Sequence, residues 1–370
     1  MSTAKKLPLN GVTVLGIEQA VAAPFCTARL ADAGARVIKI ERPEGDFARA
    51  YDEAANGQSS YFVWLNRGKE SLALDITSER GPTEIRRILT QTDVLVTNLR
   101  PGALERLGLG ATELRRDFPQ LINCSISGYG ESGPMASRKA YDLLVQAESG
   151  LCTITGGPSE PSRVGISVVD IATGASAHAA ILEALIARSV DGKGADIKVS
   201  MFDVIAEWLT VPLLNHEAGT TPKRLGLAHP SIAPYGAFAT RDGHKILIAV
   251  QSDREWATLC TEFLNEPAAV RDPHFATNVA RVTNRSQTDA IVANGFAVLD
   301  ADAAQAALLN ADVAFALVND MAGLSAHPLL RRITIDTPEG LVTLPAPGAQ
   351  ILDQDRPYGP VPRLNAHRPI

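Results

Sequence analysis

The chain has 370 residues, of which 45% are hydrophobic and 21% are charged, and its formal net charge is −6 at pH 7. This composition is typical of a globular protein with a large core, and the acidic balance argues against nucleic-acid binding. The four cysteines lie far apart and form no CxxC pair, so we expect neither a zinc site nor a disulfide framework. No leader pattern and no apolar stretch of about 20 residues is apparent, which predicts a soluble cytoplasmic protein without membrane association.

Short apolar runs alternate with helical patterns along the first half of the chain. We expect strands at residues 12–17, 36–40, 93–97 and 121–125, and a helix at residues 24–32. Such alternation is typical of an α/β fold with an open parallel sheet of the Rossmann-like kind, whose ligand site lies at the carboxyl ends of the strands. The loops that follow the strands, at residues 18–23, 41–46, 98–102 and 127–140, are therefore the first places to search for a site.

The loop after the first strand argues against a dinucleotide cofactor, because residues 18–24 contain none of the glycines that let a pyrophosphate approach the backbone. Arg42, directly after the second strand, suits a phosphate ligand, although a surface ion pair with Glu41 or Glu44 is the alternative interpretation. The same two interpretations apply to further basic residues, several of which follow strands: Arg67, Lys69, Arg100, Arg106, Arg138 and Lys139. One polyphosphate carrier that meets several of them is a reasonable partner.

Asp170 follows a β-branched run within residues 165–174 and precedes a long alanine-rich segment. The pattern predicts that Asp170 ends a strand and forms the N-cap of the next helix, where free N–H groups favour an ionised carboxylate. A positioned carboxylate can attack an acyl group, whereas ordinary helix capping is the alternative. A serine nucleophile is not indicated, because no GxSxG motif is found. His178 suits a packing role on the alanine-rich helix, and the histidine spacing predicts no metal site.

The character of the sequence changes after about residue 215. Residues 216–234 are rich in Gly, Pro and Thr, and the runs at 235–240 and 245–250, joined by Arg241-Asp242-Gly243, predict a hairpin. Helical patterns follow at residues 254–264, 285–299 and 301–309. We therefore predict a large catalytic domain at 1–215, a smaller α+β domain at 216–330, and a C-terminal segment at 331–370 that returns to the large domain as an extended arm.

Six ordered segments carry a family resemblance: LADAGARVIKIERP at 30–43, NRGK at 66–69, NLRPGAL at 98–104, YDLLVQA at 141–147, VSMFD at 199–203 and PYG at 234–236. In this order they make the chain similar to the family III CoA-transferases, also called the CaiB/BaiF family, over nearly its whole length. The resemblance implies an interlaced homodimer that takes an acyl-CoA and a free carboxylic acid, with coenzyme A as part of the substrate and no permanently bound cofactor or metal.

The resemblance also assigns roles to individual residues. Asp170 matches the catalytic aspartate of the family. The CoA groove is implied for Arg42, Lys69, Asn98, Leu99, Arg100, Arg106 and Lys139. The acyl group is implied to lie against Gln19, Ala20, Val21, Ala22, Tyr141 and Asp142.

The activity implied is transfer of CoA from an acyl-CoA, such as succinyl-CoA or mesaconyl-CoA, to a free acid through an aspartyl anhydride and an aspartyl-CoA thioester. The same family contains α-methylacyl-CoA racemases, in which a His-Asp pair stands where this chain has Tyr141-Asp142, and tyrosine is a poor base at neutral pH. A non-catalytic acyl-CoA-binding protein is a third interpretation. Short dicarboxylates are the expected acids, and candidates to hold a second carboxylate are Arg138, Arg163 and Arg224.

Overall fold

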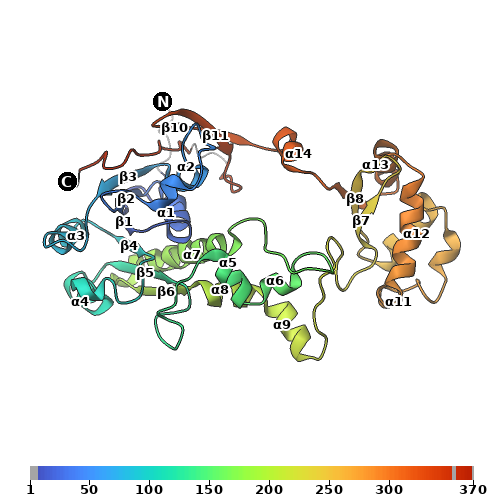
Figure 1. The fold of residues 1–370 in the computed structure, drawn as a ribbon, viewed down its shortest axis with the longest axis horizontal. Helices are drawn as coiled ribbons and strands as arrows, with labels where there is room; N and C mark the ends of the chain where they lie inside the picture. The colour runs from blue at the N-terminus through green and yellow to red at the C-terminus, as the bar shows by residue number, and fades with distance from the viewer. Residues whose placement is uncertain (1–6, 352–355, 369–370) are drawn as a thin grey trace. The chain divides into compact units, whose positions relative to one another are not determined.

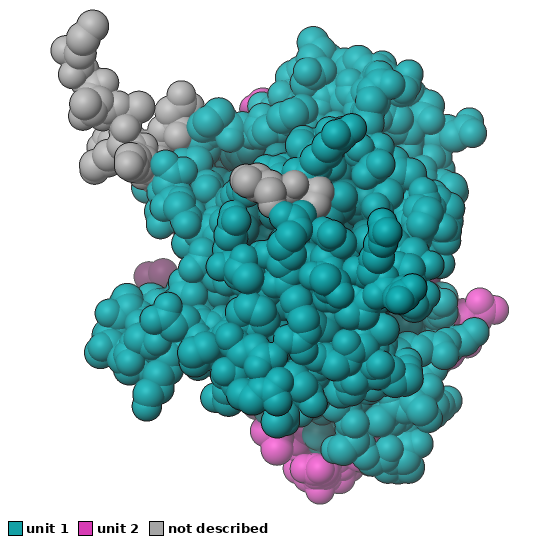
Figure 2. Space-filling model, turned by 90° about the vertical axis from the view of Figure 1, so that its left-hand side faces the viewer, with its two compact units in different colours: residues 1–151, 164–213, 331–370 teal, residues 152–163, 214–330 magenta. Residues whose placement is uncertain are grey.

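A computed structural model describes residues 7–351 and 356–368. The chain divides into two compact units (Figures 1 and 2): unit 1 contains residues 1–151, 164–213 and 331–370, and unit 2 contains residues 152–163 and 214–330. Residues 152–163, which the sequence analysis placed in the large domain, thus belong to unit 2. The short helix α6 (Leu151–Ile154) and helix α9 (Thr210–Glu217) lie at the boundaries between the units.

Unit 1 is built on a six-stranded sheet in the order β3-β2-β1-β4-β5-β6, in which all neighbours are parallel. The order runs outward in both directions from the pair β1 and β4, and ligands bind at such a switch point in open α/β sheets. This confirms the predicted fold class. The strands are β1 (Thr13–Ile17), β2 (Arg36–Glu41), β3 (Lys69–Ala73), β4 (Val94–Thr97), β5 (Ile122–Ser127) and β6 (Asp196–Ser200).

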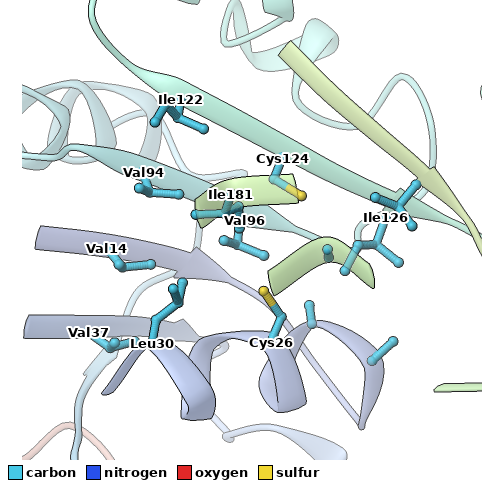
Figure 3. Close-up of a cluster of buried hydrophobic side chains, with 14 of the residues drawn as sticks. Val14, Cys26, Leu30, Val37, Val94, Val96, Ile122, Cys124, Ile126 and Ile181 are labelled. Carbon is cyan, nitrogen blue, oxygen red and sulfur yellow. The ribbon is translucent and has the colours of Figure 1, made fainter. Parts of the chain in front are cut away.

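Two helices cover one face of this sheet, α1 (Ala22–Asp32) and α7 (Val168–Asp191). Because side chains alternate along a strand, Val14 and Val37 point to these helices while Leu15 and Ile38 point to the opposite face. Figure 3 shows the first of these two cores, with strand and helix side chains in contact. The other face packs against α3 (Gly81–Leu89), η2 (Glu105–Leu107) and α4 (Ala111–Asp117).

Further helices of unit 1 are η1 (Phe47–Ala50), α2 (Ser60–Asn66), α5 (Asp142–Glu148) and α8 (Met201–Trp208). Among the described residues, α7 alone has the length and apolar composition to cross a membrane, a property that core helices also have. It packs against α1 through buried Ala172, Ala177 and Ile181, and it carries the candidate nucleophile near its first turn.

The C-terminal segment forms the hairpin β10 (Arg332–Thr337) and β11 (Gly340–Pro345), and then runs along the edge strand β3. His367 exchanges hydrogen bonds with Ser71: its Nδ1 accepts from the Ser71 N–H, and its own N–H donates to the Ser71 carbonyl, both at 3.1 Å. Asn365 Oδ1 accepts from the Ala73 N–H at 3.1 Å. The residues after β11 cover backbone groups that the edge strand β3 otherwise exposes. The hairpin of β10 and β11 was not predicted from the sequence.

Unit 2 contains a three-stranded antiparallel sheet in the order β7-β8-β9. The predicted hairpin corresponds to β7 (Tyr235–Ala239) and β8 (Lys245–Ala249). A core of its own, with Trp256 and Phe296 fully buried, joins the sheet to the surrounding helices. The other elements are α10 (Asp253–Thr258), η3 (Leu259–Phe263), η4 (Pro267–Val270), α11 (Asn278–Thr283), α12 (Arg285–Ala297), α13 (Ala301–Asn310), β9 (Ala314–Leu317) and α14 (Met321–Ala326).

Candidate active site

Asp170 is the third residue of α7, so the predictions that it ends a strand and forms the N-cap are wrong. Residues 165–167 form an irregular loop, and the N-cap position is held by Ser167, whose side chain makes no capping bond. Burial, together with the charge of Asp142, raises the pKa of Asp170 to about 7. A carboxyl group with this pKa exists in both protonation states near neutral pH, which is characteristic of catalytic groups.

Asp142 caps the start of α7, the role that we predicted for Asp170 from the sequence. Its Oδ1 accepts from the N–H groups of Val169 at 2.7 Å and of Asp170 at 3.2 Å. Its Oδ2 accepts from Gln146 Nε2 at 2.6 Å, and Gln146 Oε1 accepts from the Val164 N–H at 2.9 Å. With both oxygens in use, Asp142 holds the start of α7 and the loop before it. These contacts give Asp142 a positioning role, and direct contact with the acyl group stays a prediction.

The turn between β1 and α1 lies beside the start of α7, which carries Asp170. Ala20 and Val21 share a small apolar cluster with Tyr61 and with Ile171, the residue after Asp170. Gly174 makes this approach possible, since a Cβ there would lie 2.4 Å from the Ala22 carbonyl oxygen. The structure thus brings the predicted turn residues next to the start of α7.

The same turn is fixed from two sides. Asn98, after β4, donates to the Gln19 carbonyl at 2.8 Å and accepts from the Gln19 N–H at 2.9 Å. Asp46 Oδ1 accepts from the N–H of Ala20 at 3.2 Å. Ala20 has φ +61°, a left-handed conformation that costs free energy in a residue with a Cβ and persists only where contacts enforce it. The side-chain amide of Asn98 thus positions this turn, and its implied contact with CoA stays a prediction.

Lys69 does not present its ammonium to a ligand. Its Nζ is fully buried and donates to Glu18 Oε1 at 2.7 Å, to the Pro24 carbonyl at 3.0 Å and to Asn66 Oδ1 at 3.1 Å. Burial lowers the pKa of Lys69 to about 8, against the opposing effect of Glu18. The implied CoA contact of Lys69 is therefore not supported, because β3 delivers this side chain into the interior.

Three of the predicted basic residues do come together. Arg42, Arg100 and Arg106 line one cavity of about 550 Å³ at the carboxyl ends of β1, β2 and β4, together with Leu99 and Gln19. Arg42 Nη2 donates to Gln19 Oε1 at 3.1 Å. Lys139 does not line this cavity; it is exposed on the long loop between β5 and α5.

An aromatic path, which was not predicted from the sequence, leads from this cavity to the start of α7. The Arg42 guanidinium lies 5.8 Å from the Phe47 ring centre, which is 5.8 Å from that of Tyr51, and Tyr51 is 5.5 Å from Tyr61. The Tyr61 hydroxyl is 3.4 Å from Ser167 Oγ, at the N-cap of α7. Aromatic residues make up only 5% of the chain. The occurrence of Phe47, Tyr51 and Tyr61 within 15 residues soon after the second strand could therefore have indicated this path.

Tyr51 is electrostatically coupled to Asp170. Burial raises the pKa of Tyr51 to about 12, and the negative charges of Asp46 and Asp170 contribute, as does Tyr141. Tyr141 itself is 58% exposed. Tyr51, Tyr141 and Asp170 thus lie in one region of unit 1.

Two of the arginines predicted to hold a second carboxylate of the substrate have partners within the protein. Arg224 donates to the carbonyl groups of Thr153, Gly157 and Pro158, so it fastens a loop of unit 2. Arg138 lies 3.7 Å from Glu148 and 5.7 Å from the Tyr129 ring centre. In residues 7–351 and 356–368 no three His, Cys, Asp or Glu side chains gather as a metal ion would require.

Comparison with known proteins gives the arrangement its context. The model of "CoA-transferase family III" matches residues 9–368. The chain belongs to CoA-transferase family III. It is 39% identical to the mouse succinyl-CoA:glutarate CoA-transferase over 294 residues, which is 78% of this chain and 67% of the relative. It is 40% identical to the acetyl-CoA:oxalate CoA-transferase of Acetobacter aceti over 283 residues, 75% of this chain and 72% of the relative.

The fold agrees with this assignment. A CaiB/BaiF family protein from Brucella suis, known from a crystal structure, is 35% identical, with a TM-score of 0.84 over 98% of both chains. This family III chain is therefore a CoA-transferase, and the predicted family, fold class and enzyme status are confirmed.

Proposed function

We propose that this CoA-transferase moves CoA from a short dicarboxylyl-CoA, such as succinyl-CoA, to a free carboxylic acid, with Asp170 as the nucleophile. The observation that carries the proposal is the position of Asp170 at the start of α7, which an aromatic path joins to an arginine-lined cavity. Burial and the charge of Asp142, which raise the pKa of Asp170 to about 7, support it. A carboxylate of raised pKa is a stronger nucleophile than an ordinary one and is still ionised in good part at neutral pH.

The cavity suits the phosphates of CoA. Arg42, Arg100 and Arg106 converge on it, and guanidinium groups bind phosphate oxygens in pairs. The pantetheine arm would then follow Phe47, Tyr51 and Tyr61, whose rings are spaced 5.8 and 5.5 Å apart, and reach the start of α7 with its thioester.

The reaction needs four acyl-transfer steps. The Asp170 carboxylate attacks the thioester carbon, the C–S bond breaks, and CoA leaves as the thiolate from a mixed anhydride. The thiolate then attacks the aspartyl carbonyl, which releases the donor acid and leaves CoA on Asp170 as a thioester. The acceptor carboxylate attacks the carbonyl carbon of this thioester, the C–S bond breaks, and CoA leaves as the thiolate from the second anhydride. Finally, the thiolate attacks the acceptor acyl carbon, and Asp170 is regenerated as a carboxylate.

The start of α7 does not stabilise the oxyanions. Its first N–H groups are taken by Ile166, by Asp142 and by Ser167. The start of α1, which meets α7 at Gly174, is the better source, because the first N–H groups of a helix have no partner within the helix. We assign the oxyanion contact to this end of α1.

We infer that the enzyme is a homodimer with interlaced chains. Large apolar side chains are exposed on α5, α7, α8 and α9 of the single chain: Leu143 44%, Leu144 50%, Ile186 67%, Val190 85%, Trp208 58% and Val211 68%. Exposed apolar side chains in such numbers mark contact surfaces. Light scattering coupled to size exclusion should give twice the mass of the 39.3 kDa chain, and a monomer would refute this part of the proposal.

The acceptor is proposed as a short dicarboxylate, since the relatives named above act on glutarate and oxalate. An assay with succinyl-CoA and a panel of mono- and dicarboxylic acids in D₂O tests the reaction. We expect a new acyl-CoA from the wild type and none from Asp170→Ala, with the variant still dimeric. Deuterium beside the thioester of a 2-methylacyl-CoA without transfer would instead identify a racemase, which Tyr141 in place of histidine disfavours.

A further inference from the structure

Asp46 connects two segments that border the nucleophile, although no sequence motif singled it out. Its carboxylate is buried, and Oδ1 accepts from two N–H groups: that of Ala20 at 3.2 Å and that of Ala48 at 3.0 Å. Ala20 lies in the turn between β1 and α1, whereas Ala48 lies in η1, whose N-cap is Asp46 itself. One oxygen atom therefore ties the turn to η1.

Both segments reach the reaction centre. The turn carries Ala20 and Val21, which pack with Ile171 beside Asp170. Helix η1 begins with Phe47 and leads directly into Tyr51, whose pKa responds to the charges of both Asp46 and Asp170. A shift of either segment would change the space around the carboxyl group of Asp170.

The other oxygen of Asp46 is anchored by a buried ion network. Lys39 Nζ donates to Asp46 Oδ2 at 2.8 Å and to the Glu18 carbonyl at 3.2 Å. The network contains three cations, Lys39, Lys69 and Arg49, and three carboxylates, Glu18, Glu41 and Asp46. Because the charges balance, each buried group is compensated, which is the condition under which buried ions are tolerated.

The geometry points to Asp46 as a positioning residue, held by Lys39, that sets the left-handed turn at Ala20 and the start of η1 in the arrangement that acyl transfer requires. The inference rests on the transferase chemistry proposed above. Neither contact of Asp46 requires substrate, so the positioning exists before CoA binds, and it serves orientation more than affinity.

Two substitutions separate the functions of the two oxygens. Asp46→Ala removes the acceptor of both N–H groups, while Asp46→Asn keeps an acceptor at Oδ1 and loses only the ion pair with Lys39. We expect Asp46→Ala to lower kcat by about 10²-fold, the size of effect that a small misplacement of reacting groups has, and to raise the Kd for CoA by much less, although Asp46 lines the cavity assigned to CoA. Asp46→Asn should recover most of that kcat, although both variants lose stability.

Asp32→Asn is the matched control, because it also removes a buried carboxylate, that of the pair with Arg67, without touching the turn. It should lose stability and keep kcat. Hydrogen exchange gives a readout independent of activity: the amides of Ala20 and Ala48 should be protected in the wild type and exchange faster in Asp46→Ala than in Asp46→Asn.

The possible results are distinct. Wild-type kcat in Asp46→Ala, or equal loss of kcat in all three variants, would overturn the positioning role, as would unprotected Ala20 and Ala48 amides in the wild type. Absence of transfer by the wild type would instead overturn the proposed function, while the exchange pattern still reports on the contacts of Asp46.

Discussion

Replacing Asp170 by asparagine should stabilise the folded protein above neutral pH while it abolishes activity. The carboxyl group has a pKa of about 7 in the fold and an ordinary value of 3.8, so the folded state binds its proton more tightly than the unfolded state. Between these two pH values the folded state carries more protons, and stability falls as the pH rises. An asparagine does not titrate and escapes this loss.

The size of the effect follows from the two pKa values. Their difference, from 3.8 to about 7, corresponds to about 4 kcal/mol, since each pH unit between them is worth about 1.4 kcal/mol. Asp170 is half-buried and keeps some contact with solvent, whose screening reduces this figure to about 2 kcal/mol. We expect Asp170→Asn to be more stable than the wild type by this amount at about pH 8, and equally stable at about pH 4.

Urea unfolding followed by tryptophan fluorescence measures the difference, because Trp64 and Trp208 report on unit 1. The experiment compares both proteins at each pH, with Asp203→Asn, at the exposed side of another helix start, as the control for removing a charge. A stability difference that does not change between the two pH values would show that the carboxyl group of Asp170 titrates normally, and would refute this reasoning.

Three further predictions concern neighbouring groups. Asp142→Asn removes the charge that helps to raise the pKa of Asp170, so the acid limb of the pH profile of kcat should move down by about one pH unit; an unmoved limb would contradict the coupling. Arg100→Ala should weaken CoA binding about tenfold, by about 1.4 kcal/mol, and Arg116→Ala, outside the cavity, should not; calorimetric titration with CoA tests both. Gly174→Ala forces a Cβ to within 2.4 Å of a carbonyl oxygen of α1, so it should cost about 1–3 kcal/mol of stability and lower kcat; an unchanged melting temperature and kcat would show that α1 and α7 can separate freely.

The parallel sheet was predictable because its four central strands contain short apolar runs, since each side of the sheet needs its own hydrophobic residues. Local patterns of this kind are sufficient to predict the fold class. The edge strands β3 and β6 begin with Lys69 and Asp196 and are less apolar, and they were not predicted. The start of α7 was not predictable in the same way, since its cap comes from Asp142, which lies 28 positions before Asp170 in the sequence. A sequence window around Asp170 contains the nucleophile but lacks the group that caps its helix.

The same distinction between local patterns and distant contacts applies to the site residues. Arg42 and Arg100 lie in the loops that follow β2 and β4, and loops after parallel strands meet at one edge, so their convergence was predictable. Lys69 carries the same charge, but it begins β3, and whether a strand residue faces solvent or the interior depends on the layers packed around it. Its buried partner Glu18 lies 51 positions earlier, a separation at which no local pattern indicates an ion pair.

The most direct test of the account is to isolate CoA bound covalently to the enzyme. The wild type is incubated with succinyl-CoA, quenched in acid, digested with pepsin at low pH and examined by peptide mass spectrometry. We predict a CoA thioester on the peptide that contains Asp170, which disappears when an acceptor acid is added before the quench. Transfer that proceeds without any such adduct, or with CoA attached to a different residue, would contradict the assignment of Asp170 as the nucleophile.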